Sequence, residues 1–476
     1  MPAYRGLYAA ALPPLVAAFF ASSPYLQTGP VAITAILTFG ALSALAPPGS
    51  DRYVSLGLLL ALVVGATRLA LGLFRGGALA YLMSHAVVVG FTSAAALLIV
   101  LSQLPAALGA STSGEDILRD ALSTLAEPSS WNGAAVLLSL LVLAFLLAAP
   151  LVHPLFPAVL AAVVLSIAYG AAVDYGGETV GAIPAELPPL GLAFPWESLP
   201  SLLLPGVVIA LVGFAEPAAI ARTFAALDRQ PWDPNRELVG QGVANVTAAV
   251  AGGFPVGGSF SRSALNRRAG ARTRWSGAVA GAAALAFLPF AGSLSSLPTA
   301  ALGAVVIAAV GGLIRARAFV ELWRHAKPQV VVGAMTFLAT LAFSPHVERG
   351  VLVGIATAIG IHLWRELSLD VHSWTVGETL HVKPMGVLWF GNVTRLEVAF
   401  VDRLAEHPEA RSLAVHMIGL GRVDLTGALA LRGVLEDAEA AGLEVRLEEV
   451  PPRARGLVLR VLGREAATST SEEQAP

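Results

Sequence analysis

The sequence contains no cysteine, and only 13% of its 476 residues are charged. The lack of cysteine excludes disulfide bonds, thiolate metal sites and cysteine nucleophiles. The nine histidines are scattered without a metal-ligand pairing, so we predict neither a metal site nor a cofactor. A net charge of -2 provides no broad basic surface, which argues against nucleic-acid binding.

Apolar residues make up 56% of the chain, and the mean hydropathy is +0.72. Soluble domains are less apolar and about twice as charged, so the composition indicates a polytopic α-helical protein in a lipid bilayer. No signal peptide is predicted before the first span. The predicted spans form a group of six and a group of seven: 7–21, 30–46, 53–74, 81–104, 132–150 and 154–173, then 200–221, 238–253, 259–270, 275–292, 299–314, 328–344 and 348–364.

Positive charges alternate between the loops. Arginines cluster in the loops at 222–236, 267–274 and 315–327, whereas the loops at 105–131 and 174–198 are mainly acidic. Because cytoplasmic loops carry the excess of lysine and arginine, the basic loops are predicted to face the cytosol of a cell-membrane protein. The same alternation places the C-terminal part of the chain in the cytosol.

The composition changes after about residue 366, where apolar runs shorten and charges become frequent. Strands are predicted at 379–383, 387–390, 412–417 and 443–447, with helices at 392–406, 424–441 and 453–462. Alternating strands and helices indicate an α/β domain. We therefore predict a membrane domain over 1–366, a cytosolic α/β domain over 373–465 and a disordered tail over 466–476.

Two interrupted helices carry the functional argument. The segment 259–270, SFSRSALNRRAG, is too short and polar to be surrounded by lipid, and Ser259 can cap a helix whose first turn carries Arg262. Its counterpart is Gln27-Thr28-Gly29-Pro30, because proline after small polar residues is a helix-start signal. Broken helices in matching halves of a hydrophobic chain indicate a transporter site. Their N-termini and a guanidinium would favour an anion. The alternative is two ordinary loops, with Arg262 reaching water.

Two further intramembrane charges have different interpretations. Glu216, in VGFAEPAA, can exchange a proton during transport, or it can be a helix-end carboxylate paired with Arg222. Arg68 lies nearer the cytoplasmic end of its span and is interpreted as a snorkelling residue. His85 is interpreted as an interfacial histidine.

Small polar residues interrupt two apolar spans. Thr92 and Ser93, in GFTSAAA, either contact substrate or serve helix packing. Asn245, in GVANVTAA, has the same two interpretations, since an interhelical hydrogen bond would equally explain it.

At these residues the chain resembles the SulP family of sulfate permeases and related anion transporters. The resemblance rests on GLYAAALPPL at 6–15, SSPYLQTGPVA at 22–32, the stretch at 82–91, GFAEPAAIARTFA at 213–225 and the long run at 233–277. It covers nearly the whole chain. The C-terminal part resembles a STAS domain, with DLTGALAL at 424–431 opening its second helix.

The resemblance implies an inverted repeat of seven plus seven helices, with the anion bound between the starts of the third and tenth. The family's first helix should precede PAYRGLY, so it is expected to be missing here. A homodimer is also implied, as is proton coupling through Glu216. With Thr92 added from its own span, the predicted substrate-binding residues are Gln27, Thr28, Gly29, Val31, Thr92, Ser259, Phe260, Ser261, Arg262 and Ser263.

Thr426 lies in the helix-start region where related signalling domains are phosphorylated, and a phosphate is favoured at a helix N-terminus. It is equally explained as a cap-region residue. A cytosolic protein partner at this domain is a further hypothesis.

The leading hypothesis is a secondary, proton-coupled transporter of sulfate, bicarbonate or a dicarboxylate. A channel-like or sensory membrane protein regulated through the STAS-like domain is the alternative. A nucleobase permease of similar architecture is a third hypothesis, but it would be expected to have neither the STAS-like domain nor an arginine such as Arg262 at the second helix break. An enzyme is not predicted, because the sequence shows no nucleophile and base constellation.

Overall fold

The structure is a computed structural model that describes residues 1–462 except 3, 82–83, 113–115, 154–155, 174 and 185. The predicted tail at 466–476 lies outside the described residues. The chain divides into two compact units, residues 1–358 and 359–476, and this division falls inside helix α15, Val347–Glu366.

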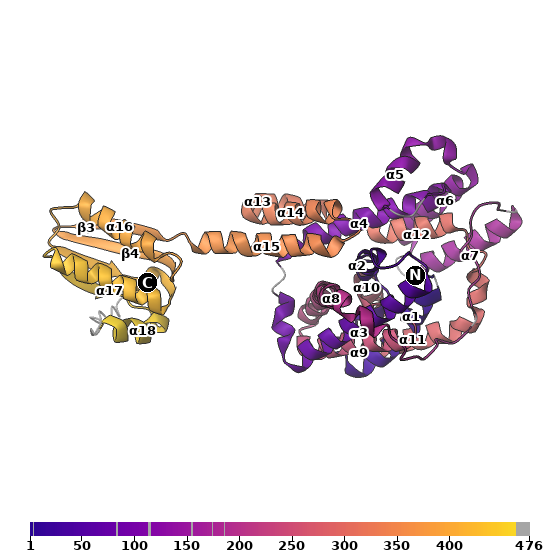
Figure 1. The fold of residues 1–476 in the computed structure, drawn as a ribbon, viewed down its shortest axis with the longest axis horizontal. Helices are drawn as coiled ribbons and strands as arrows, with labels where there is room; N and C mark the ends of the chain where they lie inside the picture. The colour runs from indigo at the N-terminus through magenta and orange to yellow at the C-terminus, as the bar shows by residue number, and fades with distance from the viewer. Residues whose placement is uncertain are drawn as a thin grey trace. The chain divides into compact units, whose positions relative to one another are not determined.

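The first unit is almost entirely helical (Figure 1). Six of its described helical segments are long and apolar enough to cross a bilayer, and four shorter apolar helices accompany them. Its elements are α1 (Tyr4–Phe20), β1 (Gln27–Gly29), α2 (Ala32–Ser43), α3 (Asp51–Leu73), α4 (His85–Leu108), α5 (Ile117–Ala126), α6 (Gly133–Val152), α7 (Ala158–Ala172), α8 (Leu199–Leu227), α9 (Pro234–Val250), β2 (Gly257–Ser259), α10 (Phe260–Arg268), α11 (Trp275–Phe287), α12 (Thr299–Gly311), α13 (Ala316–His325), α14 (Lys327–Ala342) and α15.

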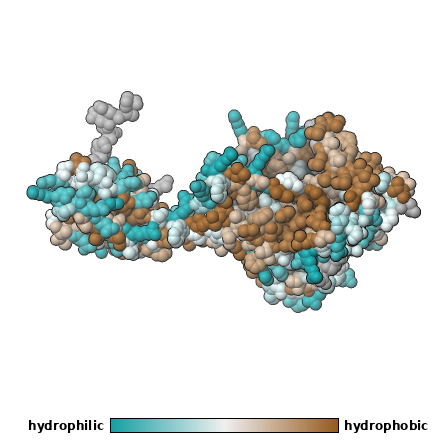
Figure 2. All heavy atoms as spheres, turned by 90° about the horizontal axis from the view of Figure 1, so that it is seen from above, coloured by the Kyte–Doolittle hydropathy of each residue, from teal (hydrophilic) through white to brown (hydrophobic). Residues whose placement is uncertain are grey.

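The surface of this unit matches a lipid environment. Figure 2 shows hydrophobic residues over much of its visible face, whereas the second unit is largely hydrophilic. Large apolar side chains of α6 and α7 face outward, including Leu140, Leu141, Val164 and Leu165. Exposed leucines at such density indicate surfaces that lipid, and not water, covers.

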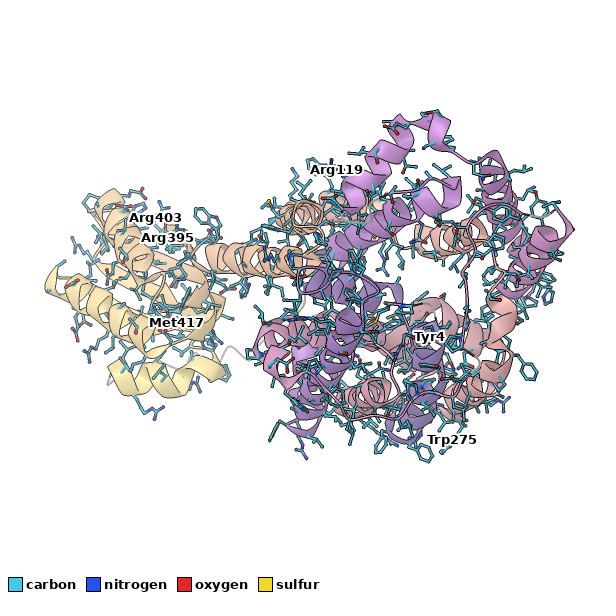
Figure 3. All side chains as sticks on the ribbon, turned by 45° about the vertical axis from the view of Figure 1, so that its right-hand side comes forward. Tyr4, Arg119, Trp275, Arg395, Arg403 and Met417 are labelled. Carbon is cyan, nitrogen blue, oxygen red and sulfur yellow. The ribbon has the colours of Figure 1, made fainter. Side chains whose placement is uncertain are left out.

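The order of elements repeats within the unit. A helix, a three-residue strand and a short helix follow one another as α1, β1 and α2, and again as α9, β2 and α10. The helix after each short helix packs on the opposite repeat, α3 against α9 and α11 against α1. Trp275, at the start of α11, packs edge-on against Phe19 near the end of α1, with ring centroids 4.9 Å apart, and Tyr4 marks the other end of α1 (Figure 3).

The helices of the repeat form one bundle, here called the first bundle: α1, α2, α3, α8, α9, α10 and α11. A second bundle comprises α4, α6, α7, α12 and α14, and α2 contacts α4 across the boundary. Glycines allow the closest packing in the first bundle. A Cβ on Gly65 of α3 would lie 2.7 Å from the backbone nitrogen of Val246, and one on Gly242 of α9 would lie 2.8 Å from that of Leu69. In a bilayer the hydrophobic effect does not drive helices together, so their association depends on the close packing that small residues allow.

Two loops expected from the sequence contain helices. The amphipathic α5 lies within the acidic segment 105–131, and α13 lies within the basic segment 315–327. Both helices are shorter than a membrane span, so hydropathy alone did not predict them.

The second unit contains a five-stranded sheet with order β3-β4-β5-β7, and β6 pairs with β4. Strand β3 is antiparallel to β4 and the other pairs are parallel. Buried residues between the sheet and its helices include Leu380, Val415, Phe400 and Met417 (Figure 3). Its elements are β3 (Asp370–Val376), β4 (Thr379–Leu388), α16 (Val393–Glu406), β5 (Ser412–His416), β6 (Leu420–Val423), α17 (Leu425–Ala440), β7 (Glu444–Glu448) and α18 (Pro452–Leu462).

The predicted strands of this unit need correction. The separate strands at 379–383 and 387–390 are one strand, β4, which continues through Pro384 with a register shift between Gly386 and Val387. Proline and glycine usually end a strand, but a bulge accommodates both. The sequence reading also missed β3, in whose sequence, DVHSWTV, apolar and polar residues do not alternate strictly, and β6.

Candidate functional site

The two predicted helix breaks meet. Strands β1 and β2 pair antiparallel, with Gln27 opposite Ser259, Thr28 opposite Gly258 and Gly29 opposite Gly257. Helix α2 begins three residues after the end of β1, and α10 begins at the residue that follows β2. The strand pair therefore brings both helix N-termini, with their free N–H groups, to one place.

Each helix start is built locally. The side chain of Ser259 caps α10 by accepting from the backbone nitrogen of Arg262, at 3.5 Å. Val31 is the extended residue before α2, and it makes no side-chain cap. The Ser261 hydroxyl lies 3.4 Å from that of Ser259, so the two can share one hydrogen bond. The N–H groups at the start of α2 therefore have no side-chain cap from Val31.

Arg262 joins the two breaks. Its Nη2 donates to the carbonyl oxygen of Pro30 at 2.9 Å. Its guanidinium also lies against Gly29, where a Cβ would be 2.9 Å from Nη1. Gly29 has a φ of +150°, a conformation that L side chains rarely adopt. The arginine of one helix thus lies at the start of the other and adds a full positive charge there.

Glu216 of α8 faces the same place. Its Oε1 accepts the backbone N–H of Phe260, the first residue of α10, at 3.2 Å. The charges of Arg315 and Arg262 both act on this carboxylate. Glu216 therefore takes one free N–H of the α10 start, directly beside the guanidinium.

The remaining predicted residues either hold the two helix breaks in place or make contacts elsewhere. Ser263 accepts the backbone N–H of Gln27 at 2.9 Å, and the Thr28 hydroxyl accepts from Gln241 Nε2 at 2.7 Å, so these residues hold the breaks in place. Phe260 is 48% exposed and stacks on Phe224. The hydroxyl of Thr92 donates to carbonyl groups of its own helix, and no hydrogen bond joins it to either break.

Three predicted intramembrane residues have structural partners. Arg68 does not snorkel: it is 0% exposed and donates to three backbone carbonyl groups of the first bundle. That interpretation was wrong, because the depth of a residue along its helix does not reveal which neighbours surround it. Asn245 bonds with both the N–H and the carbonyl oxygen of Val256. Ser93 accepts the backbone N–H of Arg315 at 3.1 Å.

A cavity of about 850 Å³ reaches the start of α2. Pro30, Val31 and Ala32 form one end, and α4, α5 and α12 form its walls. Most of the lining is apolar, with Gln103, Asp120 and Glu178 among its polar groups. The cavity gives a solute access to the N-terminus of α2 from the space between the two bundles.

The sequence of residues 1–336 matches the family model described as the Sulfate permease family. The chain belongs to this family. Relatives include the probable sulfate transporter 4.2 of Arabidopsis thaliana, 29% identical over 97% of this chain and 74% of that protein. Another is the probable sulfate transporter Rv1739c of Mycobacterium tuberculosis, 34% identical over 75% of this chain and 65% of that protein.

Solved structures support the fold. The murine Solute Carrier 26 family member A9 anion transporter, in its inward-facing state, matches 97% of this chain and 83% of its own with a TM-score of 0.86 and 20% identity. The transmembrane domain of the cyanobacterial bicarbonate transporter BicA matches 74% of this chain and 89% of its own with a TM-score of 0.63 and 23% identity. Family membership and fold identify this chain as a multi-pass membrane transporter with the inverted repeat, and not as an enzyme.

Proposed function

We propose that this Sulfate permease family member is a secondary transporter of small oxyanions, with sulfate, bicarbonate and dicarboxylates as the substrate class. The supporting observation is the position of Arg262, whose guanidinium on α10 reaches the carbonyl group of Pro30 at the start of α2. Two positive helix ends and one arginine then surround a single place that the cavity reaches.

The same geometry supports proton coupling through Glu216. Its carboxylate already accepts the first N–H of α10. A protonated Glu216 leaves the positive charge of Arg262 uncompensated, which favours an anion beside it. An ionised Glu216 competes with that anion for the same donors. Binding of the anion and of a proton therefore reinforce each other.

Uptake of radiolabelled sulfate and bicarbonate into proteoliposomes under an imposed pH gradient tests this proposal. We expect saturable uptake that Arg262→Ala abolishes. Arg268→Ala is the matched control, because Arg268 ends the same helix and is exposed. Uptake that is unchanged in Arg262→Ala contradicts the assigned site. Unsaturable, gradient-insensitive currents would instead indicate a channel-like protein.

We further propose that the second unit is a cytosolic STAS-like regulatory domain and that Thr426 is its phosphorylation site. Thr426 is exposed in the first turn of α17, and Asp424 caps that helix through the N–H of Gly427 at 2.7 Å. A phosphate on Thr426 would be stabilised by the positive N-terminus of α17 and repelled by the carboxylate of Asp424. It would therefore weaken the cap that Asp424 provides. Thr426→Asp should alter the transport rate while Thr426→Ala leaves it unchanged.

We also propose that the protein is a homodimer in the cell membrane, as the resemblance to the family implies, and mass measurement of the protein in detergent would test this.

A further inference from the structure

Within the part of the chain that the structure describes, Arg68 is a buried cation whose hydrogen bonds all go to neutral groups. Its Nε donates to the carbonyl oxygen of Ala210 at 3.1 Å, Nη1 to that of Val256 at 2.9 Å and Nη2 to that of Ile209 at 3.3 Å. The side chain is 0% exposed. Because arginine keeps its proton in proteins, a full positive charge lies inside the first bundle.

No carboxylate of the helices around α3 compensates this charge. Helix α2 carries no charged residue, and the described acidic residues of α8 and α9 are Glu216 and Glu237. Glu216 bonds to Phe260, as described above. Glu237 accepts N–H groups of Ser22, Ser23 and Trp232 instead. The other charged residues of α8 and α9 are Arg222 and Arg236. A buried charge without a counterion is energetically costly. An anion that enters the site during transport would therefore be attracted by the uncompensated charge of Arg68.

The guanidinium lies directly behind the two helix starts. Val256, which accepts from Nη1, immediately precedes β2. Gly213 lies one turn before Glu216 on α8, and a Cβ there would be 2.6 Å from Arg68 Nη2 and 3.1 Å from Thr34 Cγ2. Thr34 belongs to the first turn of α2. Arg68 therefore contacts the backbone of α8 and the segment before β2 and lies beside the first turn of α2, three segments that adjoin the anion site.

We propose that Arg68 is the second positive charge of the anion site and that it selects divalent over monovalent anions. This inference rests on the proposed function. Arg68 and Arg262 supply two positive charges and Glu216 supplies at most one negative charge. When Glu216 is protonated, a divalent oxyanion leaves the loaded site neutral. When Glu216 is ionised, a monovalent anion is enough to make the loaded site neutral.

Arg315 acts less on this balance. Arg315 faces Glu216 from the start of α13, but it is exposed, so water and salt screen it. Arg68 is surrounded by protein, where electrostatic interactions are screened least. Its charge should therefore affect a divalent anion about twice as strongly as a monovalent one.

Binding of sulfate and nitrate to the purified full-length protein at pH 5.5 tests the inference, with the ratio of the two affinities as the readout. We expect Arg68→Met to lower the sulfate affinity by about tenfold and the nitrate affinity by about threefold, because the lost Coulomb energy scales with the charge of the anion. Arg68→Lys keeps the charge and should keep the ratio. A folded Arg68→Met with the wild-type ratio overturns the inference.

A second pair of variants leaves Arg68 and its hydrogen bonds in place, in case Arg68→Met does not fold. Thr34→Asp places a carboxylate beside the guanidinium, and Thr34→Asn is its neutral control of similar size. The aspartate should lower the ratio of sulfate to nitrate affinity, and the asparagine should not. Equal ratios in both variants contradict the inference. Wild-type protein that prefers nitrate also contradicts it, whereas wild-type protein that takes up none of sulfate, bicarbonate and dicarboxylates contradicts the proposed function itself.

Discussion

The carboxylate of Glu216 accepts the backbone N–H of Phe260 at 3.2 Å, so an acidic side chain of α8 occupies the first donor of helix α10. This relationship links the protonation of Glu216 to the availability of the helix start. When Glu216 is ionised, it competes with a bound anion for this donor. When Glu216 is protonated, the side chain is neutral and the anion meets no such competition.

Glu216→Gln should uncouple transport from the proton gradient. The amide oxygen can still accept the N–H of Phe260, so the helix start keeps its geometry, but the side chain no longer carries a proton. We expect anion binding within about threefold of wild type and no proton-driven accumulation. Uptake measured with and without a pH gradient checks this, with the exposed Glu197→Gln as control. A persistent dependence on the gradient rejects the coupling role.

Gly29→Ala should weaken anion binding by displacing Arg262. The new methyl group would lie 2.9 Å from Nη1 of the guanidinium, and the φ of +150° adds backbone strain. We expect at least about a tenfold loss of affinity, which corresponds to roughly 1.4 kcal/mol. Gly311→Ala is the control, since nothing lies within 4 Å of its added methyl group. Equal affinities in the two variants would show that the arginine is not held by this contact.

The sequence predicted the two helix starts well because their signals are local. Ser259 caps α10 with its side chain, and Arg262 follows within the first turn. Pro30 lies one residue before Val31, the N-cap of α2, and not at the first helical position that the proline signal predicts. The family resemblance added the expectation that the starts meet. The pairing of β1 with β2 joins segments more than two hundred residues apart, and three-residue strands leave no periodic signal.

Buried polar residues were harder to interpret. Arg68 and Glu237 are both 0% exposed, yet their sequence neighbourhoods resemble those of helix-end residues near water. Most of their partners are backbone groups of α8 and of the segments before β1 and β2, which no local pattern reveals. Tertiary contacts, not helix position, decide whether such a charge reaches solvent.

Thr28→Val should destabilise the first bundle. The Thr28 hydroxyl accepts from Gln241 Nε2 at 2.7 Å inside the protein, and Gln241 Oε1 has no hydrogen-bond partner. Valine keeps the shape but leaves the amide with a buried, unpaired donor as well, at a cost of about 1–3 kcal/mol. Thermal unfolding in detergent should show a lower Tm. Gln241→Leu combined with Thr28→Val should recover part of the loss, because both polar groups are then removed; a further decrease would contradict this explanation.

Asp228 should stabilise the first bundle, at the end where α8 stops, only while it is ionised. The Arg267 guanidinium donates to its two oxygens at 2.6 and 3.3 Å, and this interaction, with the Tyr25 hydroxyl, lowers the pKa of Asp228. A lowered pKa in the folded state means that the stabilisation is complete above the unfolded pKa of about 3.9 and is lost as the pH falls through the folded value. Asp228→Asn should therefore lower the Tm at pH 7, and the difference from wild type should shrink below about pH 4. Arg403 and Glu406, an exposed pair on α16, provide the control variant Glu406→Gln, for which we expect a smaller change at pH 7. A difference between Asp228→Asn and wild type that stays constant from pH 7 to pH 3 would assign the loss to packing instead of charge.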